Sequence, residues 1–139
     1  MNQRPNSPKV LGRLLYHVSE LSRLAFSRAV TEYGFTPAQA RAFLAMREPV
    51  PMRALAEEWS CDASNVTAIA DALEKRGLIE RIQGTDRRVR LLTLTEEGRQ
   101  AQRELGRHVE SSPFPTDVLT PEEQRQLTDL LADVLGRQP

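Results

Sequence analysis

The sequence has 139 residues, of which 40% are hydrophobic and 27% charged, a composition typical of one globular domain. Its 19 basic and 19 acidic side chains cancel, so affinity for a charged partner must come from local clusters. No stretch has the roughly 18 apolar residues of a bilayer span, and Met1 to Val10 lacks the apolar core of a signal peptide. One cysteine and two histidines exclude an internal disulfide and argue against a structural metal site. We therefore expect a cytoplasmic protein without membrane association, metal or other cofactor.

The first third of the chain predicts two helices. Ser7-Pro8 supplies a cap and a first-turn proline, and apolar residues then recur at helical spacing until Gly34 marks the end. Thr36 to Gln39 has the capping-box pattern, in which the threonine hydroxyl accepts from the third amide and the glutamine reaches back to the amide of the cap. We expect this second helix to run to about Arg47, because two prolines follow it.

A short helix and a longer helix are predicted next, separated by a tight turn. Met52 to Trp59 gives two turns, with Trp59 on the inward face and therefore in the core. Asp62 is a good N-cap for the longer helix, which Gly77 closes. The inward positions of the longer helix repeat at helical spacing and are Val66, Ile69, Ala70 and Leu73.

Beyond Gly77 the hydrophobic pattern changes to that of strands. Leu78 to Ile82 is separated by Gly84-Thr85-Asp86 from the segment Val89 to Thr95, which is rich in β-branched residues and leucine. This pattern predicts a two-stranded hairpin.

Two further helices complete the chain. Thr95-Glu96-Glu97 opens one that runs through about Glu110, and Ser111 to Asp117 is a linker with two prolines. Thr120 to Glu123 is a second capping box, and the helix after it has an apolar stripe. The first and last helices have stripes too apolar for one chain of this size to bury fully, which favours packing of two copies over a monomer.

A short helix, a tight turn, a longer helix and a hairpin form the order of a winged helix-turn-helix domain. The segment Met52 to Gly98, MRALAEEWSCDASNVTAIADALEKRGLIERIQGTDRRVRLLTLTEEG, strongly resembles the central region of the MarR family of regulators. Within it, DASNVTAIADALEKRGLIER is similar to the family's recognition helix and first wing strand, and DRRVRLLTLTEEG to its wing signature. The resemblance implies a mainly α fold with a small β-hairpin wing, in one domain. Its DNA-binding core is expected at 36–98, flanked by dimerisation helices at 8–33 and 99–137.

The same resemblance implies a transcriptional regulator that binds double-stranded DNA as a homodimer, and we expect a repressor that acts at a palindromic operator. A two-fold dimer places its recognition helices about 34 Å apart, one turn of DNA, and so favours a palindrome. Catalysis is not expected, because no nucleophile with its base, pair of carboxylates or phosphate-binding loop is recognisable.

The first turns of the longer helix carry the candidate base-reading positions. Their side chains are short, as the floor of a major groove requires, and they are Ala63, Ser64, Asn65, Thr67 and Ala68. Asn65 can donate to and accept from adenine, and the methyl groups of this set can contact thymine. Many relatives carry a longer side chain in place of Ala68, which leaves the base preference open. The alternative is a packing helix with a small polar surface.

The hairpin is locally basic, with Arg81, Arg87, Arg88 and Arg90 against the single acid Asp86. Arginine suits the negative potential of a narrow minor groove. The resemblance assigns Arg88 as the reader at the wing tip, oriented by Asp86, with Arg87 and Arg90 beside it. The alternative is a solvated basic hairpin in which Asp86 caps a turn.

Relatives often respond to small phenolic or aromatic effectors that bind between the dimerisation helices and the winged domain. The residues that would line such a pocket here are Tyr16, His17, Phe43 and Met46, although residues of these types at helical spacing usually belong to a core. Some relatives sense oxidants through cysteine. Cys61 precedes a helix start, but Asp62 beside it opposes thiolate formation, and a buried structural cysteine is the commoner case.

A winged-helix module that binds another protein is the alternative function, because winged helices are reused as interaction domains and the net charge is zero. The two functions differ in salt dependence. Phosphate contacts make affinity fall steeply with salt, whereas a protein interface gives a shallow fall.

Overall fold

The computed structural model describes residues 7–47, 49–58 and 63–138, with the backbone alone at Glu58, Ala63 and Ser64. Trp59, Cys61 and Asp62, to which the sequence assigns a core position, a redox alternative and a helix cap, lie outside the described residues.

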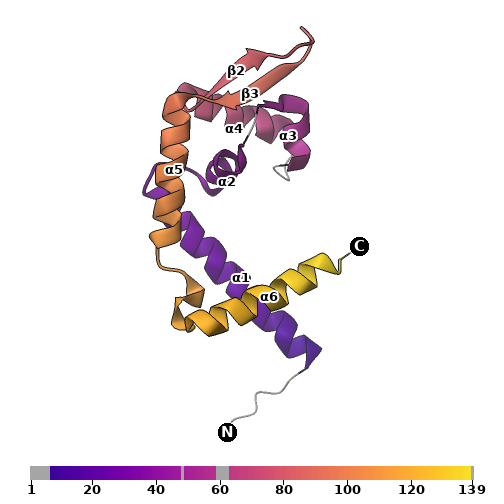
Figure 1. Cartoon of the computed structure of the whole chain (residues 1–139), viewed down its shortest axis with the longest axis vertical. Helices are drawn as coiled ribbons and strands as arrows, with labels where there is room; N and C mark the ends of the chain where they lie inside the picture. The colour runs from indigo at the N-terminus through magenta and orange to yellow at the C-terminus, as the bar shows by residue number, and fades with distance from the viewer. Residues whose placement is uncertain (1–6, 48, 59–62, 139) are drawn as a thin grey trace. The chain divides into compact units, whose positions relative to one another are not determined.

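The chain divides into two compact units, a larger one of residues 26–112 and a smaller one of residues 1–25 with 113–139. The elements of the larger unit follow one another along the chain in Figure 1 as the end of α1 (Pro8–Thr31), α2 (Pro37–Ala45), β1 (Val50–Pro51), α3 (Met52–Glu58), α4 (Ala63–Lys75), β2 (Ile79–Gln83), β3 (Arg90–Leu94) and α5 (Glu96–Ser111). This order confirms the mainly α fold with a small β wing.

The sheet has three antiparallel strands in the order β1-β3-β2. The hairpin register runs from Ile79 opposite Leu94 to Gln83 opposite Arg90. On the other side of β3, Val50 of β1 lies opposite Leu92. The expectation of two strands was therefore incomplete, because β1 is only two residues long and becomes a strand through a distant partner.

The helix ends confirm the sequence signals that lie within the described residues. The hydroxyl of Thr36 accepts from the amide of Gln39 at 3.2 Å, and the Gln39 side chain accepts from the amide of Thr36 at 3.2 Å, which completes the capping box of α2. After α4, Gly77 has φ +73°, a left-handed conformation that glycine adopts at no steric cost.

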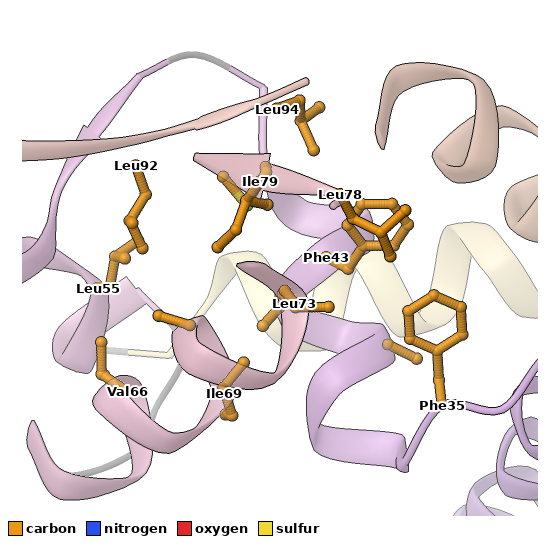
Figure 2. Packing of buried hydrophobic residues seen from close by; sticks show 14 of the residues in the cluster. Phe35, Phe43, Leu55, Val66, Ile69, Leu73, Leu78, Ile79, Leu92 and Leu94 are labelled. Atoms are coloured by element: carbon orange, nitrogen blue, oxygen red, sulfur yellow. The ribbon is translucent and has the colours of Figure 1, made fainter. Parts of the chain in front are cut away.

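The core of the larger unit lies between α4, the sheet and the helices around them. Figure 2 shows the inward side chains of α4, Val66, Ile69 and Leu73, facing the core, as the helical spacing predicted. Leu55 of α3 and Leu92 of β3 are fully buried in the same cluster. Each such side chain stabilises the fold by roughly 1.5–3 kcal/mol relative to an exposed position. The polar face of α4 is therefore held outward.

A junction at Thr95 fastens α5 to the end of α4. The Thr95 hydroxyl donates to the carbonyl of Gly77 at 2.6 Å and accepts from the amide of Gly98 at 2.9 Å. The Thr95 amide donates to the carbonyl of Leu78 at 3.1 Å. A Cβ on Gly98 would overlap that same carbonyl, so the first turn of α5 lies directly against the chain that leaves α4.

All of α5 belongs to the larger unit, where Leu105 is fully buried in the core. The expected dimerisation segment 99–137 therefore spans both units. Gln102 also ties α5 to the end of α2, because its side-chain amide donates to the carbonyl of Phe43 at 2.7 Å and to that of Met46 at 2.8 Å.

The smaller unit consists of the first part of α1, the short helix η1 (Pro115–Val118) and α6 (Pro121–Gly136). The capping box of α6 is present, and its hydrogen bonds from the amide and hydroxyl of Thr120 lower the pKa of Glu123. Large apolar side chains remain exposed on α1 and α6, namely Leu11, Leu14, Leu15, Val18, Leu21, Leu24, Leu130, Leu131, Val134 and Leu135. None of the residues of α6 is buried within this chain.

Candidate nucleic-acid interface

The outward face of α4 carries short side chains near its start. Asn65, Thr67 and Ala68 are exposed, whereas Val66 between them is buried. The burial of Val66, Ile69 and Leu73 fixes the rotation of the helix, so that the exposed set faces solvent. Ala63 and Ser64 belong to the first turn of α4, where the structure describes the backbone only.

The tip between β2 and β3 is held by its own backbone and by Asp86. Gly84 donates to the carbonyl of Val89 at 2.9 Å, and Val89 donates to that of Asp86 at 3.0 Å. The Asp86 carboxylate accepts from the backbone amide of Arg88 at 3.0 Å. Asp86 therefore shapes the turn through the backbone of Arg88, as an Asx turn does.

The arginines of the wing line two shallow hollows. One, of about 280 Å³, is lined by Arg81, Ile82, Gln83, Arg87 and Arg90. The other, of about 330 Å³, is lined by Pro51, Met52, Arg53, Arg88, Val89 and Arg90. The structure thus gathers all three predicted wing residues, with Arg90 bordering both hollows and Arg87 and Arg88 bordering one each.

Arg53 is a basic residue that the sequence analysis missed. It follows β1 directly, in the first turn of α3, and the pairing of Pro51 with Leu91 brings that turn beside the wing. Within the described parts of the chain, Arg53, Arg88 and Arg90 have no carboxylate within ion-pair distance. Recognising β1 and its register would have been needed to find this cluster.

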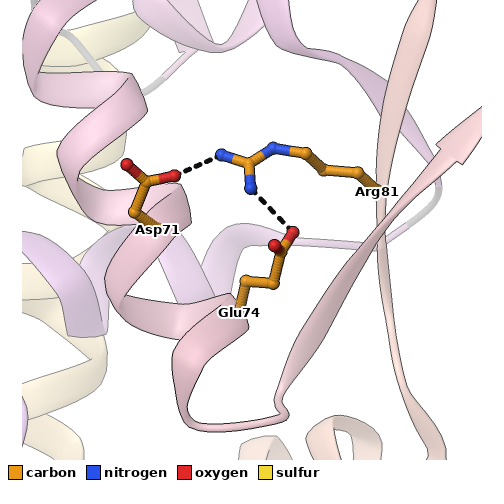
Figure 3. Close-up of polar contacts among 3 residues, drawn as sticks. All are labelled: Asp71, Glu74 and Arg81. Carbon is orange, nitrogen blue, oxygen red and sulfur yellow. Dashed lines mark hydrogen bonds and ion pairs between the residues drawn. The ribbon is translucent and has the colours of Figure 1, made fainter.

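Arg81 differs from the other arginines of the hairpin, because it is engaged within the protein. Figure 3 shows its guanidinium between two carboxylates of α4, with one hydrogen bond to Asp71 and another to Glu74 at 2.8 Å. The hydrogen bond to Asp71 is the main cause that raises the pKa of Arg81 above its ordinary value. Arg81 therefore braces the wing against α4 and does not add to the free positive charge.

The residues predicted for an effector pocket fall in different units. Phe43 and Met46 are buried in the core of the larger unit, where Phe43 stacks on Phe35 with ring centroids 5.4 Å apart. Tyr16 is 64% exposed on α1 in the smaller unit, and its ring packs edge-on against that of His17.

The side chains that the structure describes include no group of three His, Cys, Asp or Glu that could hold a metal ion. Over the same residues, no helix combines the length and the apolar character needed to cross a membrane.

Comparison with known proteins agrees with this geometry. Residues 43–90 match the model of the MarR family. Wild-type apo MarR from E. coli is similar in structure, with a TM-score of 0.80 and 24% identity over 95% of this chain and 99% of that one. The repressor CouR bound to a 23-mer DNA duplex gives a TM-score of 0.76 and 25% identity over 96% of this chain and 99% of that one. CouR from Rhodococcus jostii RHA1 bound to p-coumaroyl-CoA gives 0.70 and 24% over 93% and 94%. No curated protein sequence matches the chain.

Two successive helices beside a three-stranded basic wing define a winged helix-turn-helix protein. Together, the family match over residues 43–90 and the structural likeness over nearly the whole chain show that the chain has the winged-helix fold of MarR-family transcriptional regulators.

Proposed function

We propose that this protein is a cytoplasmic, dimeric transcriptional repressor that binds a palindromic DNA operator and is released by a small-molecule effector. The observation that carries the proposal is the pairing of a small, polar, outward face on α4 with a wing in which Arg87, Arg88 and Arg90 are not neutralised by the described carboxylates. The DNA complex of CouR supports the DNA-binding part, and its complex with p-coumaroyl-CoA supports the existence of an effector.

In this proposal, α4 enters a major groove. Asn65 pairs with adenine through its amide, and Thr67 contacts base edges or phosphates. Ala63 and Ala68 contribute methyl contacts to thymine, and Ser64 a further hydroxyl. The pair between Asn65 and adenine is bidentate and contributes roughly 1–3 kcal/mol of discrimination, and the other short side chains add weaker contacts.

The wing enters the neighbouring minor groove in this proposal. Arg88, at the turn that Asp86 shapes, reads the negative potential of the groove, and Arg87 and Arg90 contact the flanking phosphates. Attraction to DNA then comes from the local cluster of arginines, because the net charge of the protein is zero.

Dimerisation through the smaller unit is part of the proposal. The exposed apolar side chains of α1 and α6 form the surface that a second copy would cover, because large exposed apolar patches mark interaction sites. A two-fold dimer presents two copies of α4 to successive major grooves, about 34 Å apart.

Selection of bound fragments from random duplex DNA tests the proposal most directly. We expect a palindrome to be enriched by the wild-type protein and by the control variant Arg99→Ala, whose exposed guanidinium belongs to α5 and pairs with Glu96. Arg88→Ala should weaken binding to the selected fragment several-fold while leaving the melting temperature nearly unchanged.

Unchanged affinity of Arg88→Ala would contradict the role of the wing. No enrichment at all would favour a winged helix that binds protein, and a shallow salt dependence of residual DNA binding would point the same way.

A further inference from the structure

The turn that ends α1 is a Schellman motif. The amide of Gly34 donates to the carbonyl of Thr31 at 2.9 Å, and Gly34 itself has φ +76°. The amide of Phe35 donates to the carbonyl of Val30 at 3.1 Å, and both of these side chains are buried in the core. Two such backbone hydrogen bonds with a pair of apolar residues are typical of a helix end. The turn therefore has a defined shape, which a distant side chain can bind.

Arg76 joins the end of α4 to this turn. It directly follows Lys75, the last residue of α4. Its Nη1 donates to the carbonyl of Gly34 at 3.0 Å, and its Nη2 donates to that of Tyr33 at 3.1 Å. Its Cζ lies 4.0 Å from the centroid of the Phe35 ring, a cation–π contact. We call these three contacts, made by one planar group, the Arg76 clasp.

Two further elements of the larger unit hold the turn in place. The ring of Phe35 stacks on that of Phe43 in α2, with centroids 5.4 Å apart. The ring of Tyr33 packs against that of His108 in α5, with centroids 4.6 Å apart. Because the turn is packed against both α2 and α5, it gives Arg76 a fixed point to bind.

The end of α4 has two attachments, one to each neighbouring helix end. The hydroxyl of Thr95, at the start of α5, donates to the carbonyl of Gly77 at 2.6 Å. Arg76, one residue earlier, binds the turn at the end of α1. A single attachment leaves a helix free to turn about that point, whereas two attachments remove this freedom. The clasp therefore sets the angle of α4 within the larger unit.

We propose that Arg76 is a positioning residue for DNA binding, which acts on the angle of α4 without contacting DNA. By tying α4 to the end of α1, the helix whose apolar face is proposed to contact the second copy, it keeps the two copies of α4 at the separation that a palindrome requires. Arginine suits this role because its planar pair of donors defines a direction. The inference rests on the proposed function, since the separation matters only when two copies bind one DNA.

Fluorescence anisotropy on two duplexes tests this role. One duplex is the fragment selected by the wild-type protein, and the other is the same fragment with one half-site scrambled. Arg76→Gln should bind the full palindrome about tenfold more weakly than the wild type and the single half-site within about twofold of it. Each α4 still reads its own half-site, but the second copy is less well placed to bind. The slope of log K against log salt should stay as in the wild type, because no phosphate contact is lost.

A palindrome lengthened by one base pair between its halves separates positioning from a loss of stability. The wild type should bind it at least about tenfold more weakly than the selected fragment, since its two copies of α4 are held at one separation. The penalty should fall to about threefold or less for Arg76→Gln, in which α4 is freer to turn.

Two further variants separate geometry from charge. Arg76→Lys should behave like Arg76→Gln, because an ammonium keeps the charge without the planar pair of donors. The matched control is Arg99→Gln, which removes the same charge from α5, where Arg99 pairs with Glu96. This control should bind all three duplexes as the wild type does.

Hydrogen exchange of the DNA-free protein tests the clasp by itself. The amides of Gly34 and Phe35, which close the turn, should exchange at least about fivefold faster in Arg76→Gln than in Arg99→Gln. Unchanged exchange would show that the turn does not need Arg76 and would overturn the inference.

Three other results would also overturn it. They are an equal loss of affinity on the palindrome and on the half-site, wild-type binding by Arg76→Lys, and a wild-type spacing penalty in Arg76→Gln. A wild-type protein that binds the palindrome no more tightly than the half-site would instead refute the proposed function. Hydrogen exchange would in that case still decide whether Arg76 holds the turn.

Discussion

The guanidinium of Arg81 on β2 donates to the carboxylate of Glu74 on α4 at 2.8 Å, and this contact joins the wing to the helix proposed to read DNA. Only 21% of the Arg81 side chain is exposed, so the pair is less screened by solvent than the other arginine pairs of the molecule. The brace fixes the angle between two surfaces that, in the proposed complex, fit adjacent grooves at the same time.

Arg81→Gln is therefore expected to lower DNA affinity about tenfold by loosening that angle, without removing a phosphate contact. The slope of log K against log salt, measured by fluorescence anisotropy, should stay as in the wild type. A slope reduced by about 0.9 would mean instead that Arg81 contacts a phosphate directly.

Replacement of Arg53, unlike that of Arg81, should change the salt dependence of DNA binding. If it binds a phosphate beside Arg88 and Arg90, Arg53→Gln weakens binding about equally for all DNA sequences and reduces the salt slope by about 0.9. The thermal midpoint should not change, because no described residue pairs with Arg53. An unaltered slope, with Arg99→Gln as the reference variant, would remove Arg53 from the interface.

The apolar stripe of α1 predicts the oligomeric state. Leu21 is 54% exposed in the single chain, and Leu21→Glu would place a carboxylate in the proposed dimer contact. We expect light scattering to give twice the chain mass of 15.7 kDa for the wild type and for Lys9→Glu, a surface change on the same helix. Leu21→Glu should shift the mass toward the monomer, and a wild-type monomer at micromolar concentration would overturn the dimer.

Gln102 supports the larger unit by donating to two carbonyls at the end of α2, that of Met46 and that of Phe43, which also accepts from the amide of Met46. Gln102→Leu removes both hydrogen bonds and should destabilise the fold by about 1–3 kcal/mol, measured by thermal denaturation. Gln100→Leu is the control, since the Gln100 side chain donates to the exposed Glu104 on the same helix. Equal melting temperatures for the two variants would show that water replaces the amide of Gln102 at no cost.

Features that depend on neighbouring residues could be predicted from the sequence. The capping boxes at Thr36 and Thr120, the glycine after α4 and the inward face of α4 rest on local hydrogen bonds and helical periodicity. The exposed character of Asn65, Thr67 and Ala68 follows from the same periodicity. Their roles in DNA binding stay predictions.

Features that depend on contacts between segments far apart in the sequence could not be predicted from it. A two-residue segment that follows one proline and ends in another does not predict a strand, and β1 exists because Val50 pairs with Leu92. In the sequence, Arg81 cannot be distinguished from the other arginines of the hairpin. Only the fold brings its guanidinium to Asp71 and Glu74. The same holds for Arg53, which joins the wing only through the register of β1.

The Thr95 junction has a mechanical consequence. Because the hydroxyl of one residue holds both the end of α4 and the start of α5, and Gly98 leaves no gap to the carbonyl of Leu78, the connection has little freedom to bend. A small rotation of α5 about its first turn would then rotate α4 and the wing with it, as one rigid body. In a dimer, such a rotation would change the distance between the two copies of α4, even when its cause lies far from the DNA.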